Sequence, residues 1–194
     1  MNIAIKAALG CALGAVVVGT LVGGGQSAAP PVPKVPLPSD QARFVSAIIE
    51  ARSQFRSAPN ELAAGGIRNT RQQAICNAVG GQNASGWIGK VSYLSTNGDG
   101  RGVITLELGP GLHVSIWNNA ISDYSDKTLI DPDTKLFKSL AAMKKGDTVR
   151  FSGSFFPSNV DCLREQSLTL AGSMKSPVFT MRFASIRKCS WRRR

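Results

Sequence analysis

Hydrophobic residues in the first half of the chain recur at the spacing of a helix. Between residues 44 and 55 apolar side chains return every three or four positions, with charged residues between them. This pattern predicts an amphipathic helix capped by Ser39-Asp40. A second apolar stripe of the same period covers residues 71–79. We therefore expect residues 39–86 to form a helical region that packs on the domain that follows.

From residue 87 the period changes to two. Alternating apolar and polar side chains predict five strands, at residues 87–93, 103–108, 112–117, 149–155 and 178–186. An amphipathic helix over residues 134–145 separates the third strand from the fourth. Three strands, a helix and two strands is the order of an OB barrel. We predict a mainly β fold with α, a five-stranded OB-type barrel over residues 87–186 preceded by helices; a generic α+β sandwich is the alternative.

Three glycines stand inside these predicted strands, Gly89, Gly102 and Gly153. Strands of a small barrel coil sharply, and glycine within a strand is typical of such coils and bulges. Their positions favour a closed barrel. Leu168-Thr-Leu170 is a candidate for one more short edge strand.

The strand motifs resemble those of a known family. Trp87-x-Gly89-x-Val91, the Gly98-to-Gly102 turn and the later segment KKGDTVRFSGSF are similar to motifs of the bacterial tRNA-anti-like OB-fold proteins. The resemblance covers residues 87–157 well and 178–186 loosely. Because these motifs are structural, it implies a fold and no activity, and no tRNA-binding residue is carried over.

The first 38 residues differ in composition from the rest. Residues 7–22 are almost wholly apolar or small, which predicts a secretory signal peptide within residues 1–29. An uncleaved anchor is the main alternative, because Ile3 to Gly25 nearly supplies the ~20 apolar residues that span a bilayer; a buried cytosolic helix is the third. Residues 30–38 have proline at nearly every second position, which predicts a stiff spacer. We expect an exported protein, periplasmic or anchored in the inner membrane.

The net charge of +11 is concentrated at the C-terminus. Residues 158–194 hold eight Lys and Arg against two acids, whereas residues 87–157 hold eight against seven. Residues 187–194 form a basic tail that suits contact with an anionic membrane or another polyanion through Arg187, Lys188, Trp191, Arg192, Arg193 and Arg194. A solvated end without a partner is the alternative.

Export would place the cysteines in an oxidising compartment, where a pair normally forms a disulfide. Cys76, Cys162 and Cys189 allow three single pairings, and each leaves one thiol over. Because Cys189 lies in the basic tail, we predict the pair Cys76–Cys162. The chain contains no C-x-x-C motif, and we predict neither a metal nor a cofactor.

Two acidic segments and the single histidine bear on chemistry. Residues 97–100 (Asn-Gly-Asp-Gly) lack two ligands of an EF-hand loop and predict a hairpin turn, with a weak cation site as the alternative. His113 stands in no catalytic motif, so we predict no enzyme. Loop capping is the predicted role of a cluster of four acids, Asp123, Asp126, Asp131 and Asp133.

A barrel face is the best candidate for function, since OB barrels bind ligands over strands two and three. The outward positions there and on neighbouring strands are polar, aromatic or cationic: Lys90, Thr105, Glu107, His113, Ser115, Trp117, Arg150 and Arg182. We predict an exported, non-enzymatic binding or assembly module of the bacterial envelope, with an envelope protein or other ligand as partner. The alternative is a single-stranded nucleic-acid-binding protein, for example in DNA transfer, that stacks bases on Trp117. Glu107 and the nearly neutral barrel argue against a track for phosphates.

Overall fold

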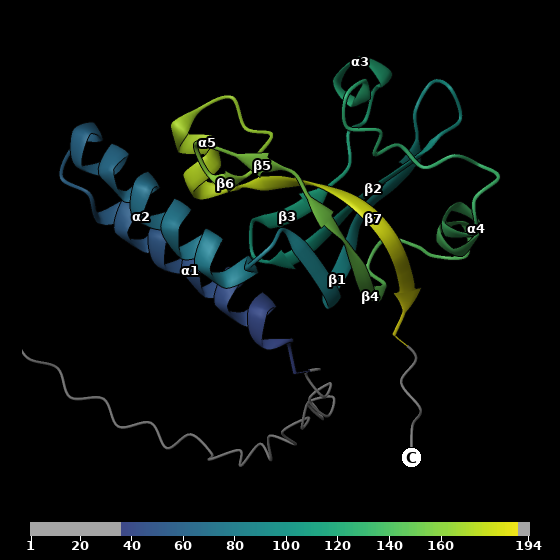
Figure 1. Cartoon of the computed structure of the whole chain (residues 1–194), viewed down its shortest axis with the longest axis horizontal. Helices are drawn as coiled ribbons and strands as arrows, with labels where there is room; N and C mark the ends of the chain where they lie inside the picture. The colour runs from purple at the N-terminus through teal and green to yellow at the C-terminus, as the bar shows by residue number, and fades with distance from the viewer. Residues whose placement is uncertain (1–35, 190–194) are drawn as a thin grey trace, which may run out of the picture. The chain divides into compact units, whose positions relative to one another are not determined.

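The computed structural model describes residues 36–189, in which two helices lead into a closed five-stranded barrel (Figure 1). Within this range no helix has both the length and the hydropathy needed to cross a bilayer. The predicted signal peptide or anchor, most of the predicted spacer and the end of the predicted tail lie outside the described residues.

The two long helices, α1 (Ser39–Ser57) and α2 (Glu61–Val79), lie side by side (Figure 1). Helix α2 begins ten residues before the predicted Arg71, where the side chain of Asn60 accepts a hydrogen bond from the Ala63 amide at 2.9 Å. The prediction that Ser39-Asp40 caps α1 is wrong, because Pro38 stands at the cap position and no side chain caps the helix. Asp40 lies inside the first turn of α1, and its carboxylate accepts a hydrogen bond from a tryptophan of the barrel instead.

The barrel closes in the order β1-β2-β3-β7-β4 and back to β1. All neighbours are antiparallel except β3 and β7, which run parallel. This order confirms the predicted OB-type fold class and excludes the open sandwich. The bounds are β1 (Asn83–Thr96), β2 (Gly102–Gly109), β3 (Leu112–Ser115), β4 (Thr148–Phe155) and β7 (Val178–Lys188).

Two short helices, α3 (Ala120–Asp123) and α4 (Lys135–Ala141), separate β3 from β4, and α4 stands where the amphipathic helix was predicted. The first and last strands of the barrel, β1 and β7, are longer than predicted. Strand β1 starts at Asn83 because Asn83 and Ala84 pair with β4, and β7 continues through Arg187 and Lys188, which pair with Arg150 and Val149.

Glycine allows the strands to approach closely, as the sequence predicted. A Cβ atom on Gly153 would lie 2.3 Å from the carbonyl oxygen of Arg182 on β7, closer than any side-chain carbon is tolerated. A Cβ on Gly102 would lie 3.0 Å from the ring of Phe137 on α4. Gly153 adjoins a bulge at which the β4–β7 register shifts.

Helix α1 closes one end of the barrel with an aromatic cluster. The Phe44 ring lies 5.2 Å from Trp87 of β1 and 5.2 Å from Phe179 of β7, and all three side chains are buried. The Gln41 amide pairs with the backbone of Ile88, donating to its carbonyl and accepting from its N–H. Among residues 36–189 the buried core draws on residues between 44 and 186, so a chain of residues 35–194 retains these core contacts.

An insertion between β4 and β7 holds a two-residue hairpin, β5 (Pro157–Ser158) with β6 (Cys162–Leu163), and a short helix, α5 (Leu170–Lys175). The edge strand predicted at Leu168-Thr-Leu170 is wrong. Thr169 caps α5 by accepting a hydrogen bond from the Gly172 amide at 3.0 Å, and Leu168 is fully exposed.

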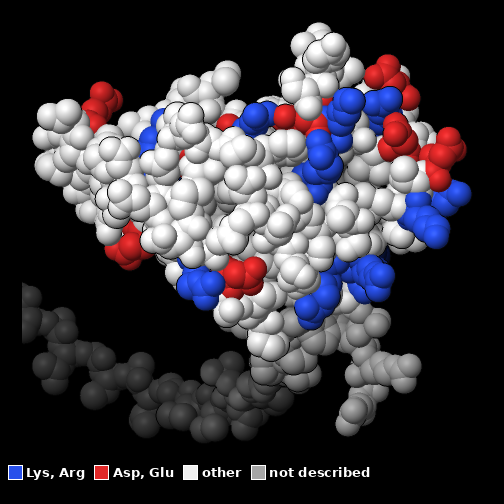
Figure 2. Space-filling model, in the orientation of Figure 1, with Lys and Arg blue, Asp and Glu red and all other residues white. Residues whose placement is uncertain are grey.

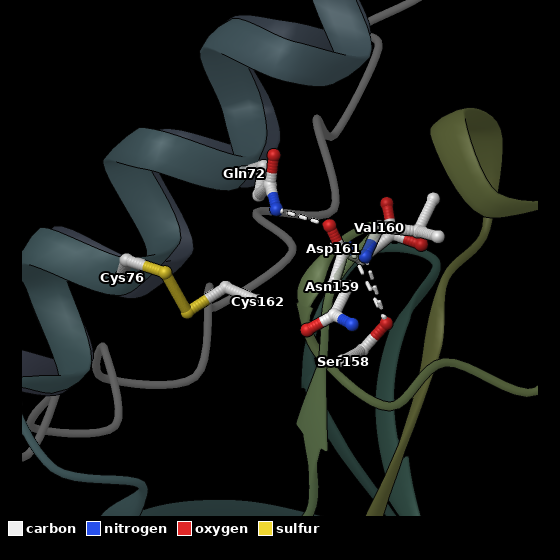
Figure 3. Close-up of a disulfide and its surroundings, with 7 residues drawn as sticks. All are labelled: Gln72, Cys76, Ser158, Asn159, Val160, Asp161 and Cys162. Carbon is white, nitrogen blue, oxygen red and sulfur yellow. Dashed lines mark hydrogen bonds between the residues drawn. A yellow bond between two sulfur atoms is a disulfide. The ribbon is translucent and has the colours of Figure 1, made fainter.

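A disulfide joins this insertion to α2, as predicted (Figure 3). Cys76 and Cys162 are linked with their Cα atoms 5.6 Å apart, and Cys189 is a free thiol. Beside the disulfide, Gln72 donates a hydrogen bond to the carbonyl of Asn159 at 2.6 Å. Several contacts therefore hold the insertion on the helices.

Candidate functional site

A groove of about 410 Å³ lies on the outer surface of the barrel, over β1, β2 and β3 and the segment that follows β3. This is the surface over which OB barrels bind ligands. Val103, Ile116 and Val178 form the apolar part of its lining. The polar and aromatic part consists of Ser92, Tyr93, Thr105, His113, Ser115, Trp117, Asn118, Ser122 and Gln166.

The floor of the groove is a fixed pair of hydroxyl groups. Thr105 of β2 and Ser115 of β3 face each other in register, with their hydroxyl oxygens 2.8 Å apart. Ser115 is buried and its hydroxyl is within hydrogen-bond reach of the Ile116 carbonyl at 3.0 Å, whereas Thr105 is half-buried. The sheet geometry thus holds hydroxyl groups at the bottom of the groove.

Trp117 forms a wall of the groove just beyond the end of β3. Its indole N–H donates to the Asp126 carboxylate at 2.7 Å, and its backbone N–H donates to the Thr128 hydroxyl at 3.0 Å. Asp126 is buried and also accepts a hydrogen bond from Arg164 at 2.5 Å. The ring is therefore held in one orientation and presents a fixed apolar surface.

Tyr93 of β1 supplies the second aromatic side chain of the groove. Strict alternation along residues 87–93 would put Tyr93 on the same side as the core residues Trp87 and Val91. The pairing of β1 with β2 shifts register between Val91 and Tyr93. This irregularity turns Tyr93 outward, so that it is 52% exposed and lines the groove. Sequence periodicity does not reveal such a bulge, because one inserted residue reverses the side of every later side chain. Gln166, in the insertion, was also missed, because no periodic pattern marks that segment.

The groove is uncharged when His113 is neutral. None of its lining residues is Lys, Arg, Asp or Glu. The His113 imidazole makes no hydrogen bond to any residue in the range 36–189, and Glu107 is its cross-strand neighbour outside the lining. This surface can exchange hydrogen bonds with a ligand and cover it with aromatic rings. A charged ligand would find no Lys, Arg, Asp or Glu in the lining to pair with.

The predicted face is therefore divided. Thr105, His113, Ser115 and Trp117 come together in the groove, whereas the other four predicted residues do not line it. Lys90 and Glu107 pair in register beside it. Arg150 lies on β4 and Arg182 on β7; the guanidinium of Arg182 lies 5.3 Å from the centre of the Phe156 ring and donates to the carbonyl of Asp126.

The Asn97–Gly100 turn and Asp123 have the structural roles predicted for them, whereas Asp126 and Asp131 form ion pairs with Arg164 and Arg101. In the turn between β1 and β2, the Asn97 side-chain oxygen accepts hydrogen bonds from the Asp99 and Arg101 amides at 3.1 and 2.9 Å. The buried Asp123 carboxylate accepts hydrogen bonds from the Thr128 and Leu129 amides. Across residues 36–189 no group of His, Cys, Asp or Glu is arranged to hold a metal ion.

Three comparisons with known proteins gave no match: no family model, no curated protein and no solved structure is similar to the chain. The strand order and the closure of the barrel are therefore the evidence for the OB-type architecture.

Proposed function

We propose that the protein is an exported, non-enzymatic OB-fold binding module of the bacterial envelope whose ligand lies in the groove over β2 and β3. The observation that carries this proposal is the groove itself, which is uncharged and aromatic and lies where OB barrels bind ligands. Export is supported by the apolar residues 7–22 and by the disulfide Cys76–Cys162, since such bonds persist in oxidising compartments.

The lining favours an uncharged oligosaccharide as the ligand class. OB barrels bind oligonucleotides and oligosaccharides over the same strands. Phosphate groups are bound mainly by Lys and Arg, which the lining lacks. Sugar rings have an apolar face that suits Tyr93 and Trp117, and hydroxyl groups that exchange hydrogen bonds with Thr105, His113 and Gln166. Envelope glycans are the class of molecule that an exported module meets.

The resemblance of the strand motifs to tRNA-anti-like OB-fold proteins supports the position of the groove, and membership of that family remains a proposal. Single-stranded nucleic acid remains the alternative ligand. It requires a base to stack on Trp117, the same ring that a sugar would cover, although no cation lines the groove to bind phosphate.

Calorimetric titration of residues 35–194 with a soluble N-acetylglucosamine oligomer tests the proposal. Tyr93→Ala should weaken binding about fivefold, which corresponds to ~1 kcal/mol of aromatic contact. Tyr124→Ala is the matched control, because Tyr124 is 85% exposed and lies outside the groove lining. A short single-stranded oligonucleotide is titrated in parallel.

The outcomes separate the ligand classes. Binding of the neutral oligomer that falls with Tyr93→Ala but not with Tyr124→Ala supports the oligosaccharide proposal. Binding of the oligonucleotide alone, with the same sensitivity to Tyr93→Ala, would replace it with the nucleic-acid alternative. Affinity for either probe that neither substitution changes would show that the groove is not the site.

A further inference from the structure

Two arginines face each other on neighbouring strands away from the groove. Arg150 of β4 and Arg187 of β7 are partners in register, and both side chains are exposed. Like charges directly opposite each other in an antiparallel pair destabilise a sheet. Neither arginine makes an ion pair with any residue between 36 and 189; Arg150 donates only to the carbonyl of Gly86, at 3.0 Å. An anion outside the chain would offset this repulsion.

The same strands continue with hydrogen-bond donors. Ser152 is paired with Ser185, and Ser154 with the exposed Arg182. Ser154 lies four positions after Arg150, a distance of about 13 Å along a strand. We call Arg150, Arg182 and Arg187 the basic row. All three are exposed on the outer face of β4 and β7. Arg150 donates to the Gly86 carbonyl and Arg182 stands over Phe156 and donates to the Asp126 carbonyl, whereas the Arg187 side chain has no partner within residues 36–189.

A hollow of about 220 Å³ adjoins the row between α4 and β7. Lys135 and Ser139 of α4 line it together with residues 184–187 of β7, so two cations and two hydroxyl groups surround it. In Figure 2 blue side chains gather near the end of β7, where Lys188 is paired with Asp147 at 2.9 Å. The hollow and the row thus form one cationic surface that a phosphate group matches in charge.

We propose that this surface docks the barrel on an anionic bilayer, with lipid phosphate groups at the basic row and in the hollow. A bilayer presents many phosphates in a plane, which suits an exposed strand pair. The phenylalanines of β4 and β7 are buried, and Phe156 is covered by Arg164 and Arg182, so neither strand offers an exposed aromatic ring for bases to stack on. In the sequence, Lys188 is followed three positions later by Trp191-Arg-Arg-Arg194, a composition typical of membrane interfaces.

The position of this surface leaves the groove accessible. In the ring order β1-β2-β3-β7-β4, the strand farthest from the β2–β3 pair is β4. A barrel docked through β4 and the far end of β7 leaves the groove open, because Val178, the first residue of β7, is the residue of that strand that lines it. The inference goes beyond the proposed function and does not depend on the groove having a particular ligand.

Vesicle sedimentation of residues 35–194 tests it, with vesicles of mixed phosphatidylglycerol and phosphatidylcholine compared with phosphatidylcholine alone. Each Lys or Arg near an anionic surface changes affinity about fivefold, so Arg150→Gln with Arg187→Gln should weaken binding to anionic vesicles about 25-fold. Arg56→Gln with Lys175→Gln is the matched control, because both residues are exposed, make no ion pair within residues 36–189 and belong to the helices α1 and α5. It should leave affinity within about twofold of the parent.

A second variant separates charge from structure. Arg150→Lys with Arg187→Lys keeps both charges and should retain binding within about threefold, provided that thermal unfolding shows every variant to be folded. Equal binding by the parent and the Gln pair, or equal binding to neutral vesicles, would overturn the proposal. Preference for a single-stranded oligonucleotide over vesicles, lost in the Gln pair, would assign the surface to nucleic acid instead. Release of the protein from anionic vesicles by millimolar inorganic phosphate would show that the surface binds free phosphate instead of a bilayer.

Discussion

Replacing Asp161 by Asn should remove the main polar anchor of the β4–β7 insertion. The Asp161 carboxylate accepts hydrogen bonds from Arg68 at 2.9 and 2.6 Å and from Arg71 at 2.5 Å. The side chains of Arg71 and Asp161 are 0% and 4% exposed, respectively. Asn keeps the size of the side chain and one acceptor oxygen, so the substitution removes the charge and leaves the packing in place.

The substitution should lower the free energy of unfolding because the buried Arg71 guanidinium would remain without its carboxylate partner. Removing one partner of a buried ion pair costs about 3–5 kcal/mol, because the other charge is left uncompensated. Arg71 keeps its hydrogen bond to the Ser173 carbonyl, and Arg68 is 27% exposed and regains water. We therefore expect the lower end, about 3 kcal/mol, or a fall in melting temperature of about 6–12 °C for a domain of this size.

The pH dependence gives a second check. Burial raises the pKa of Asp161, but hydrogen bonds from Arg68 and Arg71 and their charges outweigh it, so its pKa lies below the ordinary value. A lowered folded-state pKa contributes stability above the unfolded pKa of about 3.9, and that stability is lost as the pH falls through the folded pKa. The difference in unfolding free energy between parent and Asp161→Asn should be constant near neutral pH and narrow below about pH 4.

Urea unfolding with the disulfide intact measures both effects. Asp133→Asn is the control, because Asp133 is exposed and surface substitutions usually change stability by less than about 0.5 kcal/mol. If Asp161→Asn is as stable as Asp133→Asn at neutral pH, or if the difference grows in acid, the carboxylate does not anchor the insertion.

Two further predictions concern the frame that holds the groove. Gly153→Ala should destabilise the barrel by about 3 kcal/mol, because its Cβ would lie 2.3 Å from the Arg182 carbonyl oxygen; Gly98→Ala, with open space around it, should melt within a few degrees of the parent, and equal melting of both would contradict the close approach. Cys76→Ala with Cys162→Ala should cost about 4–5 kcal/mol, since the bond closes a sequence separation of 86 residues. Peptide mass mapping without reduction should find that pair linked and Cys189 as a thiol; any other linkage refutes the pairing.

Strand periodicity was enough to predict the barrel. Alternation of buried and outward side chains survives along β4 and from Ile104 to Glu107 of β2, and Gly153 stands where a strand must approach its neighbour. The first half of α2 was missed because Gly65-Gly66 interrupts its apolar stripe. The insertion between β4 and β7 was missed because its order comes from a disulfide and a buried ion pair with α2, contacts that leave no periodic trace.

The candidate site was only partly predictable for a similar reason. Thr105, His113 and Ser115 follow from strand alternation and the known binding face of OB barrels. Tyr93 depends on a local bulge. The orientation of Trp117 depends on Asp126, which lies nine residues away in a loop without repeating pattern. Strand alternation predicts which side of a strand a side chain lies on. Contacts from loops determine which side chains form the walls of the groove.

The central claim is that the uncharged groove over β2 and β3 is the binding surface of the barrel. Nuclear magnetic resonance shift mapping of residues 35–194, titrated with a soluble N-acetylglucosamine oligomer, tests it most directly. We expect saturable shifts at the Tyr93 and Thr105 amides and at the Trp117 indole N–H, with the Arg150 and Arg187 amides unmoved. Saturable shifts confined to β4 and β7, or a groove that responds only to an oligonucleotide, would contradict the claim.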